Sequence, residues 1–390
     1  MKRIGYLYEE ICSVENCHAA IMKASECKRS RSDVRRVLNR IDEFASELHT
    51  ILVNEEYVPS VYRILDITDG PSHKTRSIQV PRFWPDQCVH HALMNVLAPI
   101  IIRGSYRCSC GSFPNRGISA AKKAVEKATL CDKKNAKYCA KLDITKFYAS
   151  IPTDRLKAKF ARAIKDEKAL RLINVIIDSH PDGLPIGNYT SAWFANFYLQ
   201  SLDHYIKAGE GVGGLGVTHY VRYIDDMVLL GSNKRQLHKD VAAIMAYVQD
   251  ELGLKIKDNW QVFKVRRDKR MRGKRNGRPV DFLGYCFCIG YTTLRKRNAL
   301  SLMRASRKIQ TLMRYHKPVP FTLAAGFLSR VGQAQHCDYF GLRRAYIDVI
   351  SIKKLKEVVR NESKRRRVAE QRIQDRATAR AAGHGLRPAV

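Results

Sequence analysis

The sequence predicts an α+β fold, and three observations support it. Apolar residues in the segment 34–52 recur at the i, i+3/i+4 spacing of an amphipathic helix. Residues 220–230 instead predict a β-hairpin, because an aromatic run and an apolar run flank a short polar turn. From Ser301 to Arg360 the helical pattern returns, with basic residues between the apolar ones. A chain of 390 residues is long enough for one large domain or for two or three smaller ones.

The charge balance points to a polyanionic partner. The chain has 70 Lys and Arg residues against 37 Asp and Glu residues, a formal net charge of +33. Such an excess opposes compactness through self-repulsion, whereas it strengthens binding to a polyanion through counterion release. An inert basic surface is the alternative, but the basic residues also cluster, which favours nucleic acid.

Cysteine usage and hydropathy predict a cytoplasmic protein with no membrane partner. The eleven cysteines are scattered and lack the paired C-x-x-C knuckles of a zinc ribbon, so we interpret them as free thiols in a reducing cytosol. The first residues, MKRIGYLYEEICSVENC, contain no long apolar core of a signal peptide. No apolar run approaches the length of a membrane span.

The first third of the chain predicts helices, a basic hairpin and an acidic strand end. Residues 1–57 are predicted to be helical, and residues 61–80 form a hairpin whose second strand carries Lys74 and Arg76. A basic hairpin can bind phosphates, or it can be a solvated face. After a buried helix over 85–103, a core strand ends in Asp143, where a carboxylate has no stabilising role.

The middle of the chain predicts a second pair of acids. The loop 183–191 contains Pro185 and Gly187, which fix a turn whose backbone can approach a ligand closely. A later hairpin carries Asp225 and Asp226 at its tip. Burying two like charges is costly unless a cation binds them, although Asp is also a common turn residue.

The last third is basic. An amphipathic helix over 234–252 precedes the segment 264–278, whose charge density predicts an exposed loop. We expect this loop to contact nucleic acid through five of its residues: Arg266, Arg267, Lys269, Arg270 and Arg272. A strand at 281–285 follows, then helices, and the last thirty residues are expected to form a solvated helix that frays into a disordered tail.

Together the three acids predict a site for two Mg²⁺ ions. Mg²⁺ prefers a few carboxylates combined with substrate phosphate, and two such ions drive in-line phosphoryl transfer. Asp143 and Asp225 are the expected ligands, and Asp226 is included as a supporting acid.

The order of these motifs resembles a reverse transcriptase. The motifs are the basic hairpin, D-x-x-x-x-Y at 143–148, the Pro-x-Gly loop, Y-x-D-D at 223–226 and F-L-G-Y at 282–285. The resemblance covers about residues 60–290 and implies a right-hand polymerase with fingers, a palm built on an antiparallel sheet, and a helical thumb. The expected domains are an N-terminal helical extension (1–57), fingers and palm (58–290), a thumb (291–360) and a basic tail (361–390).

The resemblance implies that the three acids bind metal, joined by the backbone carbonyl of Ile144. One Mg²⁺ would lower the pKa of the primer 3′-hydroxyl, and the other would neutralise the leaving pyrophosphate. Tyr148 matches the steric gate, whose ring excludes the ribose 2′-hydroxyl and so selects dNTPs. The lysine expected as general acid for pyrophosphate is replaced by Trp260, which leaves Lys255 or Lys257 for that role.

The resemblance also implies substrate contacts. Lys74 and Arg76 resemble the residues that hold the triphosphate, and Leu283-Gly284 resembles the primer grip. Ile186 and Gly187 belong to the loop on which the nascent base pair rests. The helical thumb would ride on an RNA–DNA duplex.

One departure narrows the resemblance. Most relatives carry Pro-Gln-Gly in this loop, whereas Pro185-Ile186-Gly187 opens an I-G-N-x-T-S signature that resembles reverse transcriptases of diversity-generating retroelements. Those enzymes copy a template-repeat RNA into cDNA and misincorporate opposite adenines. Ala192 replaces the usual Gln, whereas the segment 332–338 again resembles that group's thumb. The implied partners are a structured template RNA and a small, basic, helical accessory protein, in a bacterial or phage-encoded system.

Two other interpretations remain open. A bacterial antiphage-defence or retron reverse transcriptase would keep the polymerase and change its role, and Ala192 favours this alternative. A catalytically silent RNA-binding scaffold would keep only the fold, but a scaffold has no need of the intact acids Asp143, Asp225 and Asp226.

Overall fold

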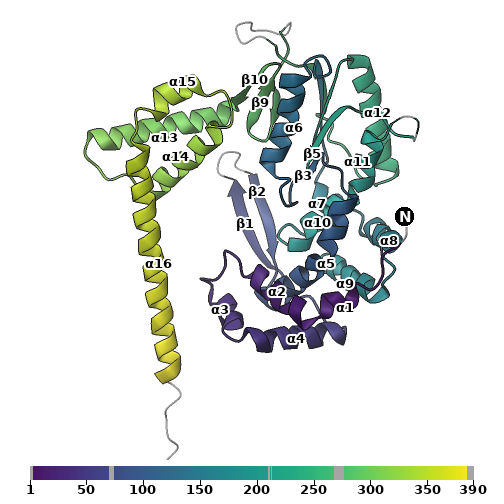
Figure 1. Ribbon diagram of the computed structural model, residues 1–390, viewed down its shortest axis with the longest axis vertical. Coiled ribbons are helices and arrows are strands. Elements are labelled where there is room, and N and C mark those ends of the chain that lie inside the picture. The colour runs from purple at the N-terminus through teal and green to yellow at the C-terminus, as the bar shows by residue number, and fades with distance from the viewer. Residues whose placement is uncertain (1–2, 70–73, 210, 212, 268–275, 384–390) are drawn as a thin grey trace, which may run out of the picture. The chain divides into compact units, whose positions relative to one another are not determined.

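The computed structural model describes residues 3–69, 74–209, 211, 213–267 and 276–383. The chain forms two units, Met1–Arg278 (unit 1) and Pro279–Val390 (unit 2) (Figure 1). Unit 1 contains a two-stranded and a five-stranded sheet, and unit 2 contains a three-stranded sheet. Each unit combines strands with helices, which confirms the predicted α+β class.

Helices and strands alternate in blocks along unit 1. Its helices are α1 (Tyr8–Cys12), α2 (Val14–Ala24), α3 (Ser32–Leu38), α4 (Ile41–Val53), the π-helix η1 (Phe83–Gln87), α5 (Cys88–Gly104), α6 (Ile118–Cys131), α7 (Phe147–Ser150), α8 (Thr153–Ala163), α9 (Glu167–Asp178), α10 (Tyr189–Tyr198), α11 (Gln200–Lys207) and α12 (Lys234–Asp250). Its strands are β1 (Arg63–Asp69), β2 (Lys74–Val80), β3 (Ser109–Cys110), β4 (Tyr138–Asp143), β5 (His219–Tyr223), β6 (Asp226–Gly231) and β7 (Gln261–Lys264).

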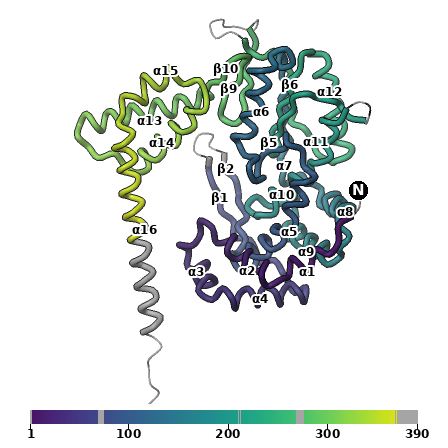
Figure 2. The backbone as a smooth tube through the Cα atoms, in the orientation of Figure 1, coloured from purple at the N-terminus to yellow at the C-terminus, as the bar shows by residue number. Residues whose placement is uncertain are grey.

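The N-terminal helices share the hydrophobic core of unit 1. Helix α2 packs against α4 and α5, and α1 packs against α5 and α9; Figure 2 shows these helices side by side. The Tyr8 hydroxyl donates to the Leu52 carbonyl at 2.5 Å, and the Asn16 side chain donates to the Ala92 carbonyl at 3.0 Å. The predicted helical extension is therefore tied directly to α5.

The single amphipathic helix predicted over 34–52 is wrong, because the structure has two helices there. Helix α3 ends at Leu38 and α4 begins at Ile41. Arg40 between them has non-helical angles, with φ −135° and ψ 43°. Val34 and Leu48 are nevertheless both fully buried, so the apolar spacing identified the core side chains and missed the break.

The predicted basic hairpin is confirmed as β1 and β2. The strands pair antiparallel from Arg63 opposite Val80 to Asp69 opposite Lys74. Apolar side chains of β1 are exposed, with 68% of Ile64 accessible. The hairpin forms its own two-stranded sheet.

The five-stranded sheet has the order β3-β5-β6-β4-β7. All neighbours pair antiparallel except β3 and β5, which are parallel. Met227, Val228 and Leu229 of β6 are all buried, because β6 is central and helices α6 and α12 pack on the sheet. The sheet therefore gives a rigid base to the residues at its strand ends.

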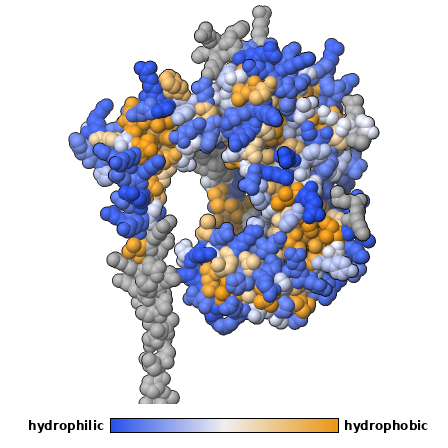
Figure 3. All heavy atoms as spheres, in the orientation of Figure 1, coloured by the Kyte–Doolittle hydropathy of each residue, from blue (hydrophilic) through white to orange (hydrophobic). Residues whose placement is uncertain are grey.

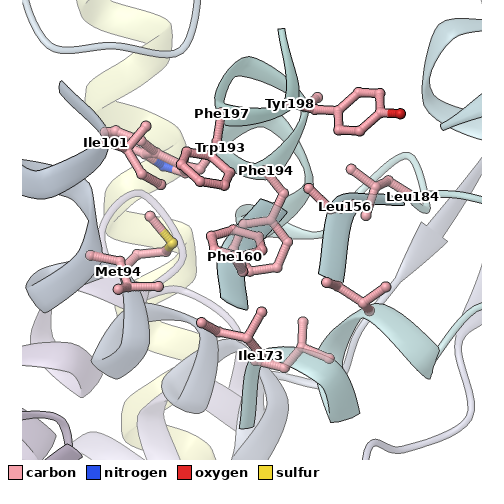
Figure 4. Packing of buried hydrophobic residues seen from close by; sticks show 14 of the residues in the cluster. Met94, Ile101, Leu156, Phe160, Ile173, Leu184, Trp193, Phe194, Phe197 and Tyr198 are labelled. Atoms are coloured by element: carbon pink, nitrogen blue, oxygen red, sulfur yellow. The ribbon is translucent and has the colours of Figure 1, made fainter. Parts of the chain in front are cut away.

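Aromatic packing joins α8 to α10 in the core of unit 1 (Figure 4). The Phe160 ring lies 4.9 Å from the Phe194 ring and 4.4 Å from the Phe197 ring, measured between centroids. Burying one such side chain contributes about 1.5–3 kcal/mol. This cluster fixes α10, the helix that follows the Pro-x-Gly loop.

Unit 2 is a small sheet followed by helices. Its strands are β8 (Val280–Phe282), β9 (Tyr285–Cys288) and β10 (Tyr291–Leu294), in the order β10-β9-β8. Its helices are α13 (Lys296–Arg314), α14 (Phe321–Ala334), α15 (Phe340–Leu342), the π-helix η4 (Arg343–Ile347) and α16 (Ile352–Gly383). Helix α14 packs against both α13 and α16.

Hydrophilic side chains predominate on the face of each unit shown in Figure 3, with separate apolar patches among them. This surface agrees with the excess of Lys and Arg in the sequence. Among the described residues, no helix is long and apolar enough to cross a membrane.

Candidate active site

The fold brings the three predicted acids together at one edge of the five-stranded sheet. Asp143 is the last residue of β4, and Asp226 is the first residue of the neighbouring strand β6. The two are direct partners in the antiparallel register. Asp225 lies in the two-residue connection between β5 and β6. We call this connection together with its two flanking residues the acidic turn (Tyr223–Asp226).

Local sequence explains why the strands end at the acids. Cys139, Ala140 and Leu142 of β4 are buried, and the strand ends as soon as its side chains become acidic. Strands β5 and β6 pair from His219 opposite Leu230 to Tyr223 opposite Asp226. A turn of two residues then places Asp225 directly beside the pair of strand ends.

Burial and repulsion by Asp143 make the carboxyls of Asp225 and Asp226 unusually weak acids. Burial, together with the negative charge of Asp143, raises the pKa of Asp225 from 3.8 to about 6. Burial likewise raises the pKa of Asp226 from 3.8 to about 6, although Lys141 opposes the rise. Ionising both carboxyls in the folded protein therefore costs free energy, and a bound cation would offset that cost.

Two lysines among the described residues reach the acids. The Lys257 ammonium lies 2.5 Å from Asp143 Oδ2, and the Lys257 N–H donates to the Asp143 carbonyl at 2.8 Å. The Lys141 ammonium lies 3.5 Å from Asp226 Oδ2. Lys255, the other lysine considered from sequence, instead pairs with Asp258 at 3.3 Å.

Lys141 was missed by sequence reasoning, although a signal was present. Side chains two residues apart on a strand share a face. Lys141 and Asp143 both belong to β4, so the spacing alone puts the lysine on the acidic face.

The carboxylates keep oxygens for a cation. Asp143 Oδ1 and Asp226 Oδ1 are buried and accept no hydrogen bond from the described residues. Carboxylate oxygens of this kind are the donors that Mg²⁺ prefers. Within the described ranges no group of three or more His, Cys, Asp or Glu side chains is arranged to hold a metal, and two of the acids are paired with lysine instead.

Tyr148 and Ile144 follow Asp143 along the chain. Tyr148 belongs to α7 and is half-buried; burial and the charge of Asp225 raise its pKa to about 12. Ile144 is fully buried and forms a β-bridge with Ile256.

The Pro-x-Gly loop joins Tyr148 to the basic hairpin. At one end the Leu184 N–H donates to the Tyr148 carbonyl at 2.8 Å. At the other end Gln79 of β2 holds Ile186 twice, because its N–H donates to the Ile186 carbonyl at 2.7 Å and its Oε1 accepts from the Ile186 N–H at 3.1 Å. The Ile186 side chain is 41% exposed.

Gly187 is required by this close approach. Its φ is +130°, and an added Cβ would lie 2.2 Å from the Gln79 carbonyl oxygen. A side chain at this position is excluded both by backbone conformation and by space.

The comparison that decides the family covers the whole of this site. The family model described as reverse transcriptase (RNA-dependent DNA polymerase) matches residues 73–287, more than half of the chain. The chain belongs to the reverse transcriptase family. The matched domain is therefore an RNA-directed DNA polymerase, a nucleotidyltransferase, with a right-hand polymerase fold.

Solved structures similar to this reverse transcriptase include telomerases. Apo telomerase from Candida tropicalis, truncated from its C-terminal domain, is 14% identical with a TM-score of 0.43, over 63% of this chain and 58% of that one. Telomerase from Candida albicans with a TWJ fragment of telomeric RNA is 12% identical with a TM-score of 0.44, over 83% and 62%. The chain thus spans less than two thirds of either structure. None of the curated proteins compared with it by sequence matches.

The remaining candidate residues of this reverse transcriptase lie on the hairpin and beyond the sheet. Lys74 is the first residue of β2, and its side chain lies outside the described structure; the Arg76 side chain is exposed. Leu283 and Gly284, in unit 2, form the turn between β8 and β9 with φ of 52° and 87°.

Only part of the predicted basic loop is described. The Arg266 N–H donates to the Arg278 carbonyl at 2.9 Å, and the Arg267 N–H donates to Asn276 Oδ1 at 3.3 Å. The other three predicted contacts lie outside the described residues: Lys269, Arg270 and Arg272.

Proposed function

We propose that this reverse transcriptase copies a template-repeat RNA into cDNA and misincorporates opposite template adenines, as diversity-generating retroelement enzymes do. The observation that carries the proposal is Ile186. Gln79 fixes its backbone through two hydrogen bonds, while its apolar side chain remains 41% exposed. An apolar group replaces the amide that could order the nascent base pair, so discrimination there is loosened.

The acids supply the reaction centre in this proposal. Asp143, Asp225 and Asp226, with the Ile144 carbonyl, would hold two Mg²⁺ ions, which when bound activate the primer 3′-hydroxyl and neutralise the pyrophosphate. The buried, unpaired oxygens of Asp143 and Asp226 support this role. Lys257, paired with Asp143, is the side chain we propose to protonate pyrophosphate, in preference to Lys255.

Other residues bind and select the substrates. The Tyr148 ring, on α7 shortly after Asp143, excludes a ribose 2′-hydroxyl. Lys74 and Arg76 hold the triphosphate, and Gly187 keeps the loop close to the hairpin that carries them. Leu283-Gly284 acts as the primer grip.

The proposed partners are a structured template RNA, its cDNA product, dNTPs and a small, basic, helical accessory protein. The basic residues of the segment 264–278 contact nucleic acid: Arg266, Arg267, Lys269, Arg270 and Arg272. The four-part division into extension, fingers and palm, thumb and tail, and a cytoplasmic location in a bacterial or phage-encoded system, belong to the same proposal.

A second role is favoured by one residue. Ala192 stands where the retroelement group has Gln, and this departure supports a bacterial antiphage-defence or retron reverse transcriptase. That enzyme would use the same acids on another template. The intact acids weigh against a silent RNA-binding scaffold.

Sequencing the products of primer extension tests the proposal. Purified protein, with dNTPs and Mg²⁺, would copy a defined RNA in which all four bases occur in matched contexts. We expect errors concentrated opposite adenine, and a marked reduction of these errors in Ile186→Gln. Ile118→Gln is the matched control, because Ile118 is an exposed isoleucine (48%) at the start of α6.

Two results would count against the retroelement role. Equal error frequencies opposite all four bases would favour the defence or retron alternative. Errors that concentrate at adenine but do not change in Ile186→Gln would remove Ile186 as their cause.

A further inference from the structure

Arg222 of β5 is fully buried and uses every N–H group of its guanidinium. An arginine side chain has five such donors in a rigid fork. Nε and Nη2 donate to the two Asp203 carboxylate oxygens at 2.8 and 2.5 Å. The other acceptors are Ser109 Oγ at 2.6 Å, Asn196 Oδ1 at 2.9 Å and the Ile224 carbonyl at 2.8 Å.

The Ile224 carbonyl belongs to the acidic turn. Ile224 directly precedes Asp225 and has φ of 59°, a left-handed conformation that is unfavourable for a β-branched residue. Two hydrogen bonds hold it there. Its N–H donates to the Cys110 carbonyl at 3.1 Å, and its carbonyl accepts from Arg222.

The other contacts of Arg222 reach three separate elements. Ser109 lies on β3, Asn196 on α10 and Asp203 on α11, and Asp203 is as fully buried as Arg222. Asn196 also donates to the Gly111 carbonyl at 3.1 Å. The turn backbone is therefore connected through one side chain to the packed interior of unit 1.

We propose that Arg222 is a positioning residue that holds the acidic turn in its strained conformation, so that Asp225 stays in place beside Asp143. This inference rests on the proposed metal-binding role of those acids. A buried ion pair is often replaceable by apolar residues without loss of stability. Such a replacement would not restore the bonds to Ser109, Asn196 and the Ile224 carbonyl. Of these three bonds, the one to the Ile224 carbonyl reaches the acidic turn.

Two variants separate positioning from stability. The double variant Arg222→Met/Asp203→Leu removes both buried charges and leaves neither unpaired. Arg222→Lys keeps the charge, but a lysine has three donors and no fork. The matched control, Lys122→Met/Glu126→Leu, removes an ion pair of 2.5 Å between two residues of α6.

Five quantities are measured for each variant: the thermal unfolding temperature, its shift on adding Mg²⁺, kcat and KM for dNTP in primer extension, and the Mg²⁺ concentration for half-maximal rate. We expect folded variants in which kcat falls about 10- to 100-fold, because small misplacements of reacting groups cost this much. The half-maximal Mg²⁺ concentration should rise and the Mg²⁺-induced shift should shrink, while KM for dNTP stays within about twofold, since the nucleotide contacts are untouched. The control should match the unmodified protein in all five quantities.

The proposal is overturned if either variant folds and keeps the original kcat and Mg²⁺ requirement. It is also overturned if neither variant folds, because Arg222 then serves the fold as a whole. Asp225→Asn, measured in the same series, separates this failure from failure of the proposed function. If Asp225→Asn extends primers at the original rate, the role of the acids is wrong; if it is inactive while the Arg222 variants are unchanged, only the positioning role is wrong.

Discussion

At the scale of single residues, the chemistry of the site follows from charges held in a confined space. Asp225 and Asp226 have pKa values raised from 3.8 to about 6, and the lysines beside Asp143 and Asp226 offset part of that cost. The strand-end acids were predictable, because carboxylates that interrupt apolar strands need a reason to be there. The contacts of Arg222 were not predictable, since its partners lie up to 113 residues away in the sequence.

The raised pKa values predict how stability depends on pH without metal. Below about pH 4 both acids are protonated in the folded and unfolded chain. Between about pH 4 and 6 the unfolded chain releases these protons first, so the free energy of unfolding falls as pH rises and the loss is complete above about pH 6. Asp225→Asn/Asp226→Asn lacks this loss. In EDTA, the unfolding temperature of the variant minus that of the original protein should therefore be larger at pH 7.5 than at pH 4. A difference that does not depend on pH would contradict the raised pKa values.

Lys257 and Lys255 form a natural pair of test positions. Lys257→Met should lower kcat about 100-fold or more, because a general acid contributes this much. Lys255→Met should change kcat less than about twofold, because Lys255 pairs with the exposed Asp258 instead. Pre-steady-state primer extension across pH measures both. Equal effects of the two substitutions would exclude Lys257 as the proton donor.

Tyr148 should determine sugar selection. Tyr148→Val should raise rNTP incorporation relative to dNTP by about 10- to 100-fold, because a small side chain no longer fills the space of the 2′-hydroxyl. Tyr148→Phe is the control, since it keeps the ring and loses only the hydroxyl. The ratio of kcat/KM for dNTP and rNTP reports the effect, and an rNTP preference that appears in Tyr148→Phe as well would mean that the hydroxyl, not the ring, discriminates.

At the scale of elements, the loop 183–187 links the hairpin to α7, the helix that follows Asp143. The sequence predicted the loop and its close backbone approach, because Pro185 and Gly187 restrict it. It did not predict the partner, because Gln79 lies 107 residues from Ile186 and the two meet only after β2 has folded against the loop. The break between α3 and α4 was missed for a similar reason, since both helices bury their apolar residues in one core.

Gly187→Ala should separate the loop 183–187 from β2. The added Cβ would lie 2.2 Å from the Gln79 carbonyl oxygen, and the strained φ of +130° alone costs about 1–3 kcal/mol. We expect a lower unfolding temperature and a higher KM for dNTP. Gly117→Ala is the control, because nothing lies within 4 Å of its added Cβ. Unchanged unfolding and KM in Gly187→Ala would show that the loop does not depend on this close approach.

At the scale of the whole molecule, the net charge of +33 should govern RNA binding. Neutralising the five basic residues proposed in the segment 264–278 should weaken binding and reduce the slope of log Kd against log salt by about 0.7–0.9 for each phosphate that is no longer neutralised. A matched variant neutralises five basic residues of the N-terminal helices and their connections: Lys23, Arg29, Arg31, Arg35 and Arg36. Salt-dependent filter binding compares them, and equal slopes would mean that the segment contributes only general charge.

The central claim is that Asp143 and the acidic turn form the reaction centre of an RNA-directed DNA polymerase. Primer extension on an RNA template, titrated with Mg²⁺, tests it most directly in the original protein and in Asp143→Asn and Asp225→Asn, after thermal unfolding has shown that each variant is folded. We predict Mg²⁺-dependent cDNA synthesis by the original protein and a loss of at least about 1,000-fold in either folded variant. Full-rate synthesis by either folded variant would contradict the claim.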